Sequence, residues 1–255
     1  MLKPPIFLLL LLTSFVGCNT TDDSPQKALV SINFSHSFNQ QTLNSNNFNA
    51  LQYTNAFGTT LSFSKLRYLI SEISFTNQQG IKTLVKDYQL VDLGEDTGLF
   101  IDDILLPEGT YLLSMRFGFT EITNTSNVYP DLNAASWNVP EMLGGGYHYM
   151  QMEGRFLDLN NEEFIYAYHT ISAVQNPGPE NTREDTSIAL NLGEITISQD
   201  QTQINVTMDI DQWFENPNLW DLNTLNGMLM GNYTAQKMMQ ENGQTVFSLD
   251  TSMGN

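Results

Sequence analysis

The chain contains three histidines, His36, His148 and His169, and each lies in a segment where apolar and polar residues alternate. Successive side chains of a β-strand point to opposite faces, so this alternation indicates strands with one buried face. All three histidines fall on the more apolar phase of their segments, which predicts that they point inwards. A single inward histidine is more often hydrogen-bonded to backbone. Because buried imidazoles need polar partners, three that converge favour a shared metal ion.

The residue types around the histidines narrow the choice of metal. Imidazole suits copper, zinc or nickel. Cys18 is the only cysteine, so a thiolate-based structural zinc site and a disulfide are both excluded. Met150 and Met152 share the phase of His148, and thioether sulfur favours Cu(I). Methionine also fills gaps in cores, and both interpretations of this pair stay open.

Strand-like segments that must position these side chains follow one another along most of the chain. They are residues 29–38, 60–75, 82–92, 110–119, 147–157, 163–174, 187–197 and 203–210. A change of phase predicts a bulge or bend near Leu66. Apolar spacing over 225–241, followed by Gly243, predicts one helix. The sequence therefore predicts an all-β protein, an antiparallel β-sandwich with a short C-terminal helix.

The N-terminal residues have the order of a bacterial lipoprotein signal peptide. A basic start at Lys3 precedes an apolar run over 6–12 that is too short to span a bilayer, and FVGC ends in Cys18. FVGC resembles a lipobox, which predicts export, lipidation of Cys18 and anchoring in the outer membrane, facing the periplasm or the cell surface. An ordinary signal peptide with a chance cysteine is the alternative. We expect a signal peptide over 1–17, a tether over 18–27 and one β-sandwich domain over 28–255.

The charge balance excludes some partners. The chain has 28 acidic and ten basic residues, for a net charge of −18. Such a surface repels nucleic acid and anionic lipid headgroups, so membrane attachment would come from the lipid alone.

The sequence has no hydrolase, zinc-protease or phosphate-loop motif. Asp102 and Asp103 are adjacent in a strand-like context and point to opposite faces, so we expect no enzyme.

Four segments in order resemble the MbnP-like copper-binding proteins, relatives of methanobactin-associated and methanotroph surface copper proteins. They are NFSHSF, NAFGTTLSFSKLRYLISEISFTNQQG, ASWNVPEMLGGGYHYMQMEGRF and FIYAYHTI. The resemblance runs from about residue 29 to the end, including the closing helix. It implies a secreted or lipid-anchored β-sandwich that binds a copper ion for acquisition, storage or handling.

The same resemblance implies ligands. Its histidine motifs match His36 and His169, while His148 lies in an element where the family has no fixed histidine. Some relatives carry a tryptophan that a di-haem partner enzyme oxidises to kynurenine, a further copper ligand. Trp137 matches a family tryptophan and is the candidate here, with core packing as the alternative. A hypothesis of another class is an adhesion or glycan-binding sandwich whose histidines are structural.

Overall fold

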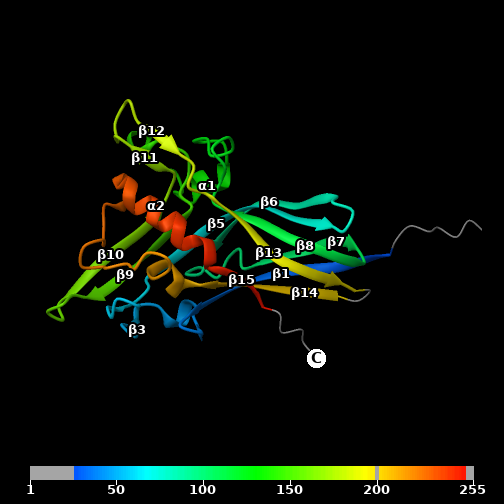
Figure 1. Ribbon diagram of the computed structural model, residues 1–255, viewed down its shortest axis with the longest axis horizontal. Helices are drawn as coiled ribbons and strands as arrows, with labels where there is room; N and C mark the ends of the chain where they lie inside the picture. The colour runs from blue at the N-terminus through cyan, green and yellow to red at the C-terminus, as the bar shows by residue number, and fades with distance from the viewer. Residues whose placement is uncertain (1–25, 199–200, 251–255) are drawn as a thin grey trace, which may run out of the picture.

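The computed structural model describes residues 26–198 and 201–250, and β-strands dominate this part of the chain (Figure 1). The strands form two curled sheets and a small hairpin. The predicted fold class, a mostly antiparallel β-sandwich with one short helix near the C-terminus, is confirmed. No helix in the described residues is long and apolar enough to cross a membrane. Cys18, the predicted lipidation site, lies outside the described residues.

The smaller sheet has the order β15-β14-β1-β2. β7 pairs with the first part of β1, and β2 pairs with its last two residues. Its strands are β1 (Lys27–Phe38), β2 (Gln41–Thr42), β7 (Phe100–Pro107), β14 (Gln201–Asp209) and β15 (Phe247–Asp250). β1 and β14 run parallel over nine residue pairs, an exception to the antiparallel pairing elsewhere. The parallel pair is possible because the chain enters β14 from the other sheet rather than from a hairpin with β1.

The larger sheet has the order β13-β8-β5-β9-β4-β3, with β6 paired to β5 and β10 to β9. Its strands are β3 (Tyr53–Thr54), β4 (Thr60–Leu61), β5 (Lys65–Asn77), β6 (Lys82–Asp92), β8 (Gly109–Phe117), β9 (Met150–Leu157), β10 (Glu163–Thr170) and β13 (Ile188–Ile197). β5 is central: one edge pairs with β6, and the other pairs with β9 in its first part and with β8 further on.

Short elements connect the sheets. The hairpin is β11 (Ala173–Gln175) and β12 (Thr182–Glu184), and the α-helices are α1 (Pro130–Ala134) and α2 (Tyr233–Asn242). The 3-10 turns are Ser45–Asn47, Glu141–Leu143, Ile210–Phe214, Leu229–Gly231 and Gly243–Thr245. The predicted change of phase near Leu66 is found at a bend at Ser64, since Phe63 and Leu66 are both fully buried.

The C-terminal helix is shorter than the predicted range 225–241, which was wrong at its start. α2 begins only at Tyr233, because Asn232 caps it by accepting a hydrogen bond from the backbone N–H of Ala235. Upstream, Met228 adopts a left-handed conformation, with φ of 56°, which interrupts any longer helix. Apolar spacing alone did not reveal this break.

His36 lies in the core between the sheets, where its Nε2 is 3.0 Å from the hydroxyl of Tyr68. The side chain is 3% exposed, and Tyr68 is fully buried. Burial lowers the pKa of His36 from 6.5 to about 4, because the charged imidazolium would lose its hydration. The ring is therefore neutral at physiological pH, as the inward phase of its strand predicted.

This lowered pKa makes the fold sensitive to acid. The imidazole of the unfolded chain protonates near pH 6.5 and the buried ring only near pH 4, so the unfolded state binds the extra proton between these values. The stabilisation is present above about pH 6.5 and is lost as the pH falls toward 4. We expect wild type to lose about 2–3 kcal/mol of unfolding free energy between pH 7 and 4.5 through His36, measured by denaturant unfolding.

The matched control is His36→Gln, which keeps a hydrogen-bonding group beside Tyr68 but cannot titrate. Its stability at pH 7 is expected to differ from wild type, so the quantity compared is the loss between the two pH values. Between pH 7 and 4.5, the unfolding free energy of the variant should fall by about 2–3 kcal/mol less than that of wild type. Equal losses in the two proteins would show that His36 does not carry the effect.

Candidate metal centre

His148 and His169 lie side by side, with ring centroids 5.4 Å apart and ring planes at 85°. His169 is in β10, and His148 lies two residues before the start of β9. The two residues are therefore 21 positions apart in the sequence and come together because β9 and β10 pair antiparallel. This pair is the part of the predicted three-histidine cluster that the structure assembles.

Strand register places a row of polar side chains beside His169. Across the three neighbouring strands, Arg67 of β5 is opposite Gln151 of β9, which is opposite His169 of β10. Two residues along, Lys65 of β5 is opposite Glu153 of β9. Directly opposite residues share one face of a sheet, and positions two apart along a strand do so as well. All five side chains therefore lie on the same face.

The other face of these strands is the core. Its side chains are all at most 2% exposed: Leu66, Tyr68, Met150, Met152, Tyr166 and Tyr168. The predicted inward phase of His169 was therefore wrong, because Tyr166 and Tyr168 take the buried phase of β10 while Ile165, in phase with His169, is 77% exposed. The pattern of apolar residues predicted the wrong buried face of β10, because the two tyrosines are buried despite their hydroxyl groups.

His148 reaches the polar face through a bend. Tyr149 and Met150 are adjacent and both fully buried, so the alternation breaks at Tyr149, and His148 does not share the face of Met150 as predicted. The carbonyl oxygen of Trp137 is 3.0 Å from Nδ1 of His148 and also accepts its backbone N–H. Burial is the main cause that lowers the pKa of His148 to about 4. The ring is neutral at physiological pH.

Glu153 links His169 to a lysine. Its carboxylate oxygen Oε1 lies 2.9 Å from Nε2 of His169 and 2.7 Å from Nζ of Lys65. The hydrogen bond from His169 lowers the pKa of Glu153 to about 2, and Lys65 adds to this while partial burial opposes it. The carboxylate is therefore ionised and fixes the orientation of the His169 ring.

Trp137 completes the surroundings of His148. Its ring is fully buried and its centroid is 5.7 Å from that of His148. The guanidinium of Arg67 lies over the indole, 4.9 Å from the ring centroid, within the range of a cation–π contact. The indole Nε1 is buried without a hydrogen-bond partner among the described residues. Buried polar atoms without a partner are uncommon in folded proteins, and the indole Nε1 of Trp213 is in the same state among the described residues.

The remaining predicted ligands lie elsewhere. His36 bonds to Tyr68 on the core face, and Met150 and Met152 are on that same face, opposite to Gln151, Glu153 and His169. In the described residues, no three side chains of His, Cys, Asp or Glu are arranged to hold a metal. The convergence of His36 with His169 expected from a common inward phase is thus not present.

The polar neighbours of His169 are not evident from the sequence alone. Arg67, Gln151 and Glu153 carry a signal in the sequence, because they occupy alternate positions in KLR and MQMEG. Without the strand register, it could not be known that these residues flank His169.

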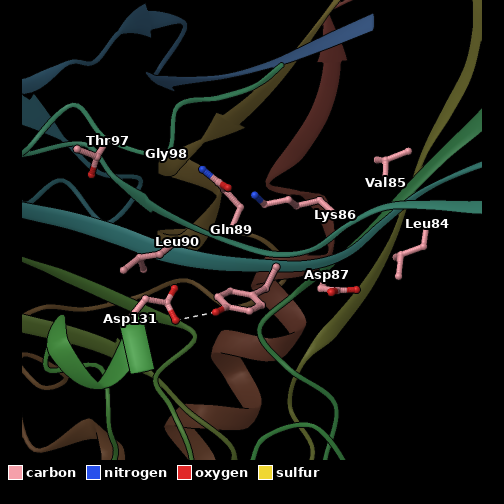
Figure 2. Close-up of a pocket in the computed structure, with 10 residues that line it drawn as sticks. Leu84, Val85, Lys86, Asp87, Gln89, Leu90, Thr97, Gly98 and Asp131 are labelled. Carbon is pink, nitrogen blue, oxygen red and sulfur yellow. Dashed lines mark hydrogen bonds between the residues drawn. The ribbon is translucent and has the colours of Figure 1, made fainter. Parts of the chain in front are cut away.

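Three surface cavities of the described structure are lined by residues other than His148 and His169. One cavity, of about 650 Å³, follows β6 and is bordered by Asp131 of α1 (Figure 2).

Comparison with known proteins places the chain in a family. The family model named MbnP matches residues 27–231. The match ends before α2, whereas the resemblance was expected to continue to the C-terminus. Among solved structures, the chain is similar to MbnP from Methylosinus trichosporium, with a TM-score of 0.57 and 12% sequence identity over 89% of this chain and 100% of that one. At this identity the likeness concerns the fold.

No curated protein matches the chain. The family match, however, extends over most of the described residues, and the fold agrees with it. The resemblance seen in the sequence is therefore confirmed, and the chain belongs to the MbnP family.

Proposed function

We propose that this protein is a non-catalytic copper-binding protein that holds one copper ion at His148 and His169. The observation that carries the proposal is the contact of these two rings on a partly enclosed polar face. Membership of the MbnP family supports copper as the metal, and imidazole ligands suit copper. The proposal replaces His36 by His148, because His36 lies on the core face.

The hydrogen bonds of the pair suit a metal. A backbone carbonyl accepts from Nδ1 of His148, which leaves its Nε2 as the nitrogen with a lone pair. The carboxylate of Glu153 accepts from Nε2 of His169, which leaves the lone pair on Nδ1. Among the described residues, neither of these two nitrogens has a hydrogen-bond partner. A histidine ligand whose second nitrogen bonds to a carbonyl or carboxylate is the usual arrangement in metal sites.

The electrostatic setting also fits. His148 is a neutral ligand, and the ionised Glu153 behind His169 raises the basicity of the His169 ring. Lys65 pairs with Glu153, and Arg67 lies 4.0 Å from Asp92. The two positive charges favour a cation of low charge such as Cu(I) at this position. Burial of His148 limits access of water to the ion.

Copper titration of single variants tests the ligand set. Outer-shell changes cost about tenfold to a hundredfold in metal affinity, so we expect His148→Ala and His169→Ala each to cost more than about a hundredfold, and Glu153→Gln to fall within that range. The measurement is competition for Cu(I) against a chromogenic chelator, with circular dichroism as a check on folding.

The control is His36→Gln, which removes the third histidine without touching the pair. It should bind copper like wild type. The proposed pair is refuted if His36→Gln loses copper binding while folded His148→Ala and His169→Ala bind copper like wild type. That result would identify His36 as the copper ligand.

We also propose that Trp137 is a target of oxidation to kynurenine by a di-haem partner enzyme, as the family resemblance implies. Its position beside His148 supports this role. Protein purified from its native host should show, by peptide mass spectrometry, the mass of kynurenine at Trp137. The same protein expressed alone in a host without such an enzyme should show an unmodified tryptophan. An unmodified Trp137 in the native host contradicts the proposal.

Finally, we propose that the protein is exported and lipid-anchored in the outer membrane through Cys18. The order of basic, apolar and small residues before the only cysteine supports this. Mass spectrometry of the mature N-terminus should find a diacylated or triacylated Cys18 as the first residue, and Cys18→Ser should abolish the modification. An unmodified Cys18, or cleavage at another position, is the result that rejects the anchor.

A further inference from the structure

A second cavity, of about 230 Å³, lies apart from the histidine pair, between β5, β6 and the segment that leads to α1. Its lining residues are Ser71, Glu72, Leu84, Asp87, Tyr88, Phe119, Thr123 and Tyr129. It shares Leu84, Asp87 and Tyr88 with the larger cavity along β6, so the two adjoin. Leu84 and Asp87 are labelled in Figure 2. Nothing in the proposed copper site uses this cavity.

Three aromatic rings form one side of the cavity. Tyr88 is 4.9 Å from Tyr129 and 5.6 Å from Phe119, and Phe119 stacks on Tyr129 at 4.8 Å between centroids. Tyr88 is held in place by donating a hydrogen bond of 2.6 Å to Asp131. The rings are therefore fixed before any ligand arrives, which lowers the entropic cost of binding.

Two carboxylates complete the lining. Glu72 is in the left-handed conformation, with φ of 54°, at the bulge where β5 changes register between Ser71 and Ser74. Bulges of this kind redirect a side chain and occur next to functional sites. Glu72 is paired with Arg116, whereas Asp87 has no ion pair among the described residues. The cavity therefore has a net negative character.

The hydrogen-bond donors of the lining are already in use. The hydroxyl of Ser71 donates to the carbonyl of Gly118, and that of Tyr88 to Asp131. The hydroxyl of Tyr129 donates to the carbonyl of Thr123.

The fourth hydroxyl, that of Thr123, is within reach of both the hydroxyl and the carbonyl of Thr120. No lysine, arginine, histidine, asparagine or glutamine lines the cavity. It thus offers carboxylate oxygens and π faces but no uncommitted side-chain donor.

We propose that this cavity binds a small organic ammonium cation, with a quaternary or alkylated nitrogen held against the rings of Tyr88 and Tyr129 and opposite Asp87. An anion would find no donor here and would face two carboxylates. A quaternary ammonium group needs no hydrogen bond and is attracted both by ring faces and by carboxylates. The net charge of −18 raises the local concentration of such cations.

Titration calorimetry with choline and tetramethylammonium tests the proposal on the full-length protein. The comparison ligand is 3,3-dimethylbutanol, which has the shape of choline without its charge. Both cations should bind at one site, and the neutral alcohol about tenfold or more weakly. Asp87→Asn should weaken choline binding by about tenfold, since it removes the unpaired carboxylate.

Matched variants separate this site from general charge effects. Asp102→Asn makes the same charge change at an exposed residue of β7, in the other sheet, and should leave choline affinity unchanged. Tyr129→Phe should retain binding and Tyr129→Leu should lose about tenfold, because only the latter removes the ring. Equal binding of the neutral alcohol, an unaffected Asp87→Asn variant, or absence of cation binding overturns the proposal. So does binding of methyl glucoside in place of the cations, which would mark a sugar site.

Discussion

The pairing register of β5, β9 and β10 is the constraint on which the candidate metal centre depends. It aligns Arg67, Gln151 and His169 in one row, with Lys65 and Glu153 in the next. A slip of one residue would turn every one of these side chains to the other face. The register is held because the opposite face carries fully buried tyrosines and methionines, whose exposure would cost far more than any polar contact contributes.

A close backbone approach helps to hold β9 in this register. Gly154 lies so close to the carbonyl oxygen of Ser62 that a Cβ at this position would be 1.9 Å from that atom. Backbone hydrogen bonds on either side, from Ser62 to Arg155 and from Ser64 to Glu153, tie the two segments together. The glycine in MQMEGRF is therefore required by packing, and it stands directly after the glutamate that orients His169.

The segment between β8 and β9 connects the two proposed sites. A second cluster of buried apolar residues, including Phe119, Trp137 and Tyr147, lies outside the main core. Trp137 presents its carbonyl and ring to His148, whereas Phe119 lines the aromatic cavity. Tyr88 and Tyr129 pack against the same cluster. A single small core thus supports an imidazole-lined position on one side and a negatively charged aromatic cavity on the other, and these two chemistries suit different cations.

The amino-acid sequence by itself determined the strand content, the family and the late helix, because period-2 alternation and ordered motifs are local signals. β6 matched its predicted range of 82–92, and the inward His36 was correctly predicted. The sequence did not determine which histidines meet. His169 and His148 come together through strand pairing and a bend at Tyr149, and both depend on contacts between residues far apart in the chain. Tertiary packing buries the tyrosines of β10. The cap at Asn232 sets the start of α2. Both override the local periodicity of the sequence.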